Sequence, residues 1–159
     1  MHTQPSGSAR RRSTGFGLHV VLLALLALAG PVHAEQMERV GDYEIHYSAI
    51  NTAFLTPDVA DAYDITRSQV QALLNVSVLE RQPDGGTRAV NAMVNGNVGN
   101  LAGQSSPLAF RTVREDDAIY QLATFRIIEG EPMRFSLMVT YDPDQPPAEV
   151  AFIQRFYSD

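Results

Sequence analysis

A single histidine follows the first 34 residues of the chain, and it limits the chemistry that the sequence can support. This residue, His46, falls on the polar side of a predicted strand. A hydrolytic triad needs a nucleophile, a base and an orienting acid, yet no serine stands in the Gly-x-Ser-x-Gly elbow that presents such a nucleophile. Cysteine is absent from the whole chain, which excludes thiol chemistry and cysteine-ligated metals. No catalytic set is visible, so we expect a protein that is not an enzyme.

Methionine and histidine are the ligands that exported copper carriers use, because soft donors suit Cu(I). The chain offers His46 together with Met37, Met93, Met133 and Met138. These residues are not clustered in the sequence, and Met133 and Met138 fall on opposite faces of one predicted strand. Methionine is also a common filler of hydrophobic cores. We therefore predict no metal site and no cofactor, and keep a small-ligand or copper carrier that uses His46 and methionines as the alternative function.

The first interpretation of function is a non-enzymatic binding or interaction module. Six polar residues form its candidate binding surface: His46, Asn51, Arg67, Asn75, Asn100 and Gln104. Each has a structural alternative, because asparagine side chains also satisfy backbone groups at turns and bulges, and Arg67 can pair with Asp61 or Asp64. Three aromatic residues are candidates as surface anchors for a partner, with packing in the core as the alternative: Tyr63, Phe156 and Tyr157.

The first 34 residues have the three parts of a secretory signal. Residues 10–12 are arginines, residues 20–29 form an uninterrupted apolar run, and Val32-His33-Ala34 offers small residues at the positions that a signal peptidase reads. The run is too short for a spanning helix, which needs about 20 apolar residues. We expect cleavage after residue 34 on the general secretory route. The product is a soluble periplasmic protein of one domain, residues 35–159, with no membrane insertion.

The expected mature chain is acidic. It keeps nine of the 12 arginines, all 18 acidic residues and no lysine, so its formal net charge is −9 with neutral histidine. Nucleic acids and anionic lipids both require a basic surface, and neither is an expected partner. The expected partner is an unknown periplasmic protein or a small ligand, although an acidic surface also serves solubility alone.

Alternation of apolar and polar residues, broken by turn signals, predicts an all-β fold. One short helix is expected over residues 57–62, with Thr56 as its N-cap, and an irregular crossover is expected over residues 95–107. Short polar connectors favour antiparallel neighbours. The pattern indicates a two-sheet antiparallel β-sandwich of immunoglobulin-like type, with a small closed barrel as the alternative. Seven strands are predicted: 43–49, 71–80, 87–94, 108–113, 118–127, 133–141 and 148–157.

Several blocks of the chain resemble a small exported family of Gram-negative bacteria, the domain-of-unknown-function family numbered 4426. The most specific blocks are Gly41-Asp42-Tyr43-x-Ile45-His46-Tyr47 and Phe54-Leu55-x-Pro57-x-Val59-Ala60. Shorter matches are Asn75-Val76-Ser77-Val78, Asn100-Leu101-x-Gly103-Gln104, Ala118-Ile119-Tyr120 and Phe156-Tyr157. The resemblance covers nearly all of the expected mature chain. It implies export and a compact β domain, and it brings no catalytic residue with it.

Overall fold

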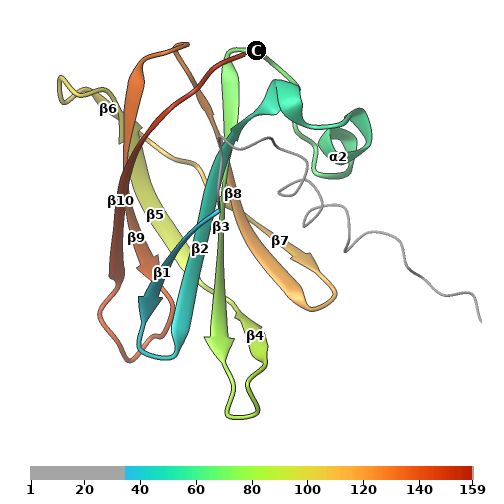
Figure 1. Ribbon diagram of the computed structural model, residues 1–159, viewed down its shortest axis with the longest axis vertical. Coiled ribbons are helices and arrows are strands. Elements are labelled where there is room, and N and C mark those ends of the chain that lie inside the picture. The colour runs from blue at the N-terminus through green and yellow to red at the C-terminus, as the bar shows by residue number, and fades with distance from the viewer. Residues whose placement is uncertain (1–34, 159) are drawn as a thin grey trace, which may run out of the picture.

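The computed structural model describes residues 35–158, which form two antiparallel β-sheets packed face to face (Figure 1). The predicted all-β, two-sheet antiparallel sandwich with one short α-helix is confirmed. The two sheets stay separate, so the alternative of a closed barrel is wrong. The predicted signal peptide lies outside the described residues. Among residues 35–158, no helix is long and apolar enough to span a bilayer.

The larger sheet has six strands, and its central strand has two different neighbours along one edge. Five strands follow one another in space: β1 (Gln36–Val40), β2 (Tyr43–Asn51), β3 (Gln71–Arg81), β8 (Ala118–Arg126) and β7 (Arg111–Glu115). Residues 71–76 of β3 pair with β8, and residues 78–81 pair with the sixth strand, β4 (Thr87–Val90). Along this edge, the first part of β3 therefore pairs with β8 and the last part pairs with β4. The larger sheet forks at the point where the partner changes.

The smaller sheet packs on the larger one through a group of aromatic rings. Its order is β10 (Ala148–Arg155), β9 (Pro132–Thr140), β5 (Met93–Gly99) and β6 (Ser105–Pro107). Phe135 of β9 is fully buried, and its ring stacks on that of Phe152 with centroids 4.4 Å apart. The same ring meets Phe125 of β8 edge-on, at 5.2 Å. Phe135 therefore joins the inner faces of both sheets.

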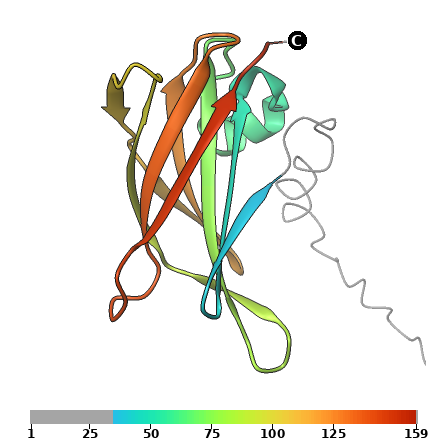
Figure 2. The same cartoon turned by 60° about the vertical axis from the view of Figure 1, so that its left-hand side comes forward.

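The helix α2 (Pro57–Ala62) covers part of the outer face of the larger sheet, on the side away from β9 and β10 (Figure 2). It has the predicted bounds and the predicted cap, since Thr56 Oγ1 accepts a hydrogen bond from the Val59 N–H at 3.4 Å. Val59 is buried in a second apolar cluster with Leu73 of β3 and Leu122 of β8. One end of this outer face is thus apolar and covered.

The predicted strand over residues 87–94 is wrong, because the chain changes sheets within it. Its first half is β4 in the larger sheet, and its second half begins β5 in the smaller one. The irregular crossover expected over residues 95–107 is also wrong, because β5 and β6 form a hairpin there. A Cβ on Gly96 would lie 2.4 Å from the carbonyl oxygen of Ser136. Glycine in this segment therefore permits close approach of two strands and does not mark a loop.

β1 is a strand that the sequence did not predict. Its residues show no alternation of apolar and polar side chains, so period-two reasoning missed it. It nevertheless pairs with β2 along its whole length, from Gln36 opposite Tyr47 to Val40 opposite Tyr43. With β1 and the two short strands β4 and β6, the described residues hold ten strands, compared with about seven predicted.

Candidate binding surfaces

His46 lies half-buried on the outer face of β2, between two carboxylates. Its Nδ1 is 2.9 Å from Glu35 Oε1, and its Nε2 is 3.4 Å from Glu44 Oε2. Glu44 also meets Arg39, whose Nε is 3.4 Å from Glu44 Oε1. A protonated imidazole carries one N–H for each of the two carboxylates. The carboxylates stand at opposite nitrogens of the ring, so they bracket the histidine and do not converge on one point.

Met37 brings a thioether to the same face. It lies on β1 directly opposite His46, and residues paired across antiparallel strands have Cβ atoms about 4.5–5.5 Å apart. The Met37 side chain is exposed. We call Glu35, Met37, Glu44 and His46 the His46 cluster. Within residues 35–158, no group of three or more histidine and acidic side chains is arranged to hold a metal ion.

The other methionines lie away from the His46 cluster. Met133 packs against the core between the sheets, whereas Met138 is exposed, which confirms that they occupy opposite faces of β9. Met93 is exposed on the neighbouring strand β5. All three belong to the smaller sheet. A copper site that uses His46 can therefore draw on Met37 but not on these residues.

Asn75 extends the polar face beside His46. On β3 it pairs with Ser48, two residues beyond His46 on β2. Its Oδ1 is buried and has no hydrogen-bond partner among the described residues, which is rare for a buried polar atom. Nearby, burial raises the pKa of Tyr120 above its ordinary value, and the carboxylates of Glu115 and Glu35 raise this pKa further. The outer face of the larger sheet is thus acidic along the side that carries His46.

Asn51 is buried and holds three backbone segments together. It is the N-cap of the short 3-10 helix η1 (Thr52–Phe54), where its Oδ1 accepts a hydrogen bond from the Ala53 N–H at 2.9 Å. Its Nδ2 donates to the carbonyl oxygens of Gln69, at 3.2 Å, and Tyr157, at 3.4 Å. These contacts match the structural alternative, in which an asparagine satisfies backbone groups at a turn.

Asn100 and Gln104 also have structural contacts, because they close the hairpin between β5 and β6. Asn100 Nδ2 donates to Gln104 Oε1 at 2.8 Å, and Asn100 Oδ1 accepts the Gln104 N–H at 3.0 Å. Arg67 is exposed, and its Nη2 donates to the carbonyl oxygen of Ala53 at 3.1 Å. No ion pair joins Arg67 to either predicted aspartate within the described part of the chain.

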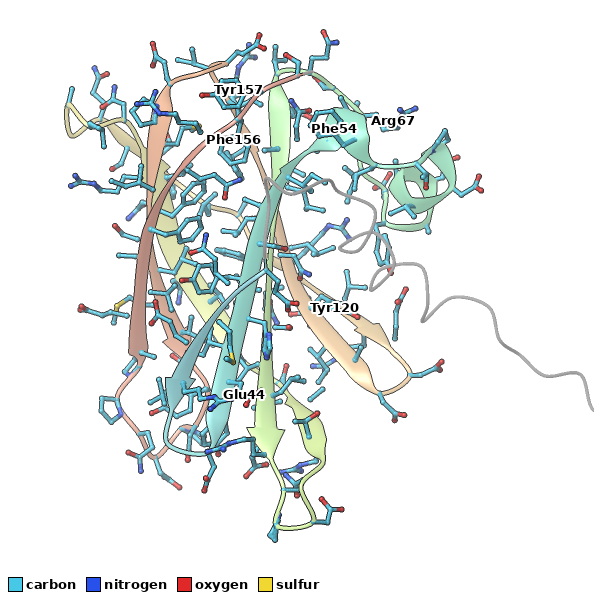
Figure 3. The ribbon with its side chains drawn as sticks, viewed as in Figure 1. Glu44, Phe54, Arg67, Tyr120, Phe156 and Tyr157 are labelled. Carbon is cyan, nitrogen blue, oxygen red and sulfur yellow. The ribbon has the colours of Figure 1, made fainter. Side chains whose placement is uncertain are left out.

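Exposed apolar side chains gather at the end of the sandwich where the chain terminates. Four of them come from separate segments, with exposed fractions of 44%, 50%, 61% and 45%: Phe54, Val70, Ile128 and Tyr157. The segments are joined, since the Ile127 N–H donates to the Val70 carbonyl at 3.0 Å and Asn51 holds Tyr157. We call these four residues the end patch. Figure 3 shows Phe54 and Tyr157 at this end, with Arg67 beside Phe54.

Two of the three aromatic anchor candidates are buried, which matches the alternative of packing. Tyr63 is buried at the end of α2, where its hydroxyl donates to Glu115 at 2.8 Å, and Phe156 is in the core. Only Tyr157 is exposed, and sequence reasoning missed the other members of the end patch because scattered apolar residues give no local signal. The six predicted polar residues also fall in separate places. His46 and Asn75 share one face, whereas the other four lie at the end patch or the β5–β6 hairpin.

Solved structures with the same fold come from several bacteria. A crystal structure of a family protein from Pseudomonas aeruginosa is 36% identical to the chain, covers 79% of it and 96% of its own length, and has a TM-score of 0.66. FetP from a uropathogenic Escherichia coli strain is 9% identical to the chain and has a TM-score of 0.56; the match covers 79% of the chain and 95% of FetP. The copper-reconstituted P19 protein from Campylobacter jejuni is 11% identical to the chain and has a TM-score of 0.52; the match covers 79% of the chain and 95% of P19.

The last two similarities concern the fold alone, because their identities are low. No curated protein matches the sequence significantly. The protein from P. aeruginosa belongs to the domain-of-unknown-function family DUF4426. The model of that family also matches residues 37–159, which include both sheets, the His46 cluster except Glu35, and the end patch. The chain therefore belongs to the DUF4426 family.

Proposed function

We propose that the protein is a non-enzymatic binding module of the periplasm, and that it binds another protein through the end patch. The observation that carries this proposal is the gathering of four large exposed apolar side chains on one end of the sandwich. Exposed apolar patches commonly mark interaction sites on soluble proteins. The export signal predicted from the sequence supports the location, as does FetP, which was produced in the periplasm for its structure.

The end patch has the composition of a protein interface. Aromatic residues and arginine are enriched among the residues that carry most of the binding energy in such interfaces, and here Arg67 lies beside Phe54. The backbone under the patch is held by Asn51, so little conformational entropy is lost when the patch is covered. The expected partner offers apolar side chains next to a carboxylate, which pairs with Arg67.

A capture experiment tests this proposal. Mature protein is immobilised, exposed to periplasmic extract, cross-linked and analysed by quantitative mass spectrometry. We expect a specific partner whose recovery falls at least about tenfold in the double variant Phe54→Ser, Tyr157→Ser, because each side chain acts as an anchor. Ile153→Ser is the matched control, since it removes an equally exposed apolar side chain from β10, outside the end patch.

The control is expected to recover the partner as the wild-type protein does. Equal recovery by the double variant would show that binding uses another surface. Recovery of no partner by the wild-type protein would contradict the interaction module itself.

A second candidate function is a periplasmic copper carrier that uses the His46 cluster. One observation favours it: the β1–β2 register places Met37 beside His46, which gives a thioether and an imidazole on one face. Both are ligands that suit copper, and Glu35 is within reach of the imidazole. The copper-reconstituted C. jejuni protein has the same fold. These residues would hold the ion, and none of them supplies a catalytic step.

Titration with Cu(I) against a chromophoric chelator tests the copper carrier. We expect one ion per chain, and a loss of affinity of at least about tenfold in both Met37→Leu and His46→Gln, since each removes a ligand. Met93→Leu is the control and should bind as the wild-type protein does, because Met93 lies on the other sheet. Substoichiometric copper, or equal affinities in all four proteins, would eliminate this function.

A further inference from the structure

The outer edge of β10 is the longest free strand edge in the part of the chain that the structure describes. β10 is the last strand of the smaller sheet and pairs with β9 alone (Figure 2). It is eight residues long, whereas the other marginal strands, β1, β4, β6 and β7, have three to five. Proteins usually protect such edges with proline, bulges or short strands. β10 contains neither proline nor glycine, so its edge is suited to another strand.

Pro132 determines which backbone groups of β10 face outward. It lies opposite Arg155 and has no N–H, so these two residues cannot exchange a pair of hydrogen bonds. Hydrogen-bonded and non-hydrogen-bonded pairs alternate along an antiparallel ladder. The N–H and C=O of Arg155 therefore point away from β9. The same holds for every second residue before it: Glu149, Ala151 and Ile153.

The neighbouring strand β5 gives the same orientation independently. The Gly96 carbonyl accepts the Leu108 N–H at 2.9 Å, so Gly96 directs its backbone groups away from β9. Leu137, which lies opposite Gly96, must then direct its own groups toward β10, where it pairs with Val150. Val150 therefore bonds to β9, and the next residue, Ala151, faces outward.

The outward-facing positions are accessible and carry opposite charges at their two ends. All four side chains are exposed: Glu149, Ala151, Ile153 and Arg155. Besides the ladder with β9, no backbone hydrogen bond between described residues reaches β10. Arg155 donates one N–H to the Gly130 carbonyl, and its guanidinium has further N–H groups for a carboxylate. The edge therefore has free donors and acceptors between an acidic and a basic side chain.

We propose that the protein forms a two-fold dimer in which β10 pairs antiparallel with β10 of a second copy. Only a two-fold axis at Phe152 gives a partner on β10 to every outward-facing residue. This register places Glu149 opposite the partner's Arg155 at both ends, and Ala151 opposite the partner's Ile153. Opposite charges that face each other stabilise an antiparallel pair, whereas like charges destabilise it.

The second copy fits this edge better than an unrelated strand does, because the sequence of charges along β10 is complementary to itself when it is reversed. A two-fold contact uses the same edge on both copies, so assembly stops at two chains. The contact joins two four-stranded sheets into one continuous sheet. It is independent of the end patch, and the antiparallel arrangement places the two end patches at opposite ends of the joined sheet.

Sedimentation equilibrium of the mature protein over a range of concentrations tests the dimer. We expect the mass of two chains at high concentration. Ala151→Pro should raise the dissociation constant at least about tenfold, because it deletes an outward N–H from each copy and leaves the ladder with β9 intact. Thermal unfolding shows whether this variant folds, and the charge variants decide the matter if it does not.

Reversal of the charges tests the register. Glu149→Arg and Arg155→Glu each place like charges opposite one another, and each should raise the dissociation constant about tenfold. The double variant with both substitutions restores opposite charges and should dimerise as the wild-type protein does. Asp117→Arg is the matched control for Glu149→Arg, since it makes the same change of net charge at the exposed turn between β7 and β8. It should leave the dissociation constant unchanged.

A monomer at every concentration would overturn the proposal. A double charge variant that dimerises no better than the single variants would also overturn it, because another register would then be in use. A dimer that persists in folded Ala151→Pro but is lost in the double variant Phe54→Ser, Tyr157→Ser would place the second copy on the end patch, and this too would overturn it.

Discussion

Replacement of Phe135 by alanine is expected to lower the free energy of unfolding by about 3–5 kcal/mol. The ring is fully buried and stacks on Phe152 at 4.4 Å. It also meets Phe125 and Phe156 edge-on. Alanine would lose the transfer free energy of the ring and leave a cavity between the two sheets, since neither sheet can collapse far into the space.

Urea denaturation followed by circular dichroism measures this effect. Ile153→Ala serves as the control, because this β10 side chain is large, apolar and exposed. Surface substitutions usually change stability by no more than about 0.5 kcal/mol. A loss of less than about 1 kcal/mol for Phe135→Ala would mean that the sheets are not held together at this ring.

Replacement of Asn51 by alanine is expected to cost about 2–3 kcal/mol, because it removes a helix cap and two further hydrogen bonds. It also releases the segments that carry Val70 and Tyr157. Hydrogen exchange at the amides near these two residues should therefore accelerate more than the global loss of stability explains.

Asn97→Ala is the matched control for this prediction, since Asn97 is an exposed asparagine on β5. Its unfolding free energy and its exchange rates at the end patch should stay close to those of the wild-type protein. An Asn51→Ala protein of unchanged stability would contradict the structural role of these hydrogen bonds.

Local signals in the sequence predicted the local elements well. The helix appeared with its bounds and cap because Thr56, Pro57 and Asp58 act on neighbouring backbone groups. Strands with one buried face, such as β2, alternate as expected. β1 was missed because both of its faces are largely polar. Apolar and polar residues alternate along a strand only where a neighbouring layer buries one of its faces.

The candidate sites depend on contacts between distant segments, and this is why sequence reasoning found only parts of them. Met37 stands beside His46 only through the register of a strand that was not predicted. The end patch combines side chains from four segments that meet only in the folded chain. None of these features leaves a periodic or local pattern.

The fork of the larger sheet has a consequence for how the chain folds. Its central seam joins β3 to β8, which are separated in sequence by the whole of β4 to β7. Loops of such length must close before the seam forms, and non-local β pairing is slow, with typical times of milliseconds to seconds. Until β8 has been synthesised, β3 has only β2 and β4 as partners. We therefore expect completion of the sandwich to be a late event in folding.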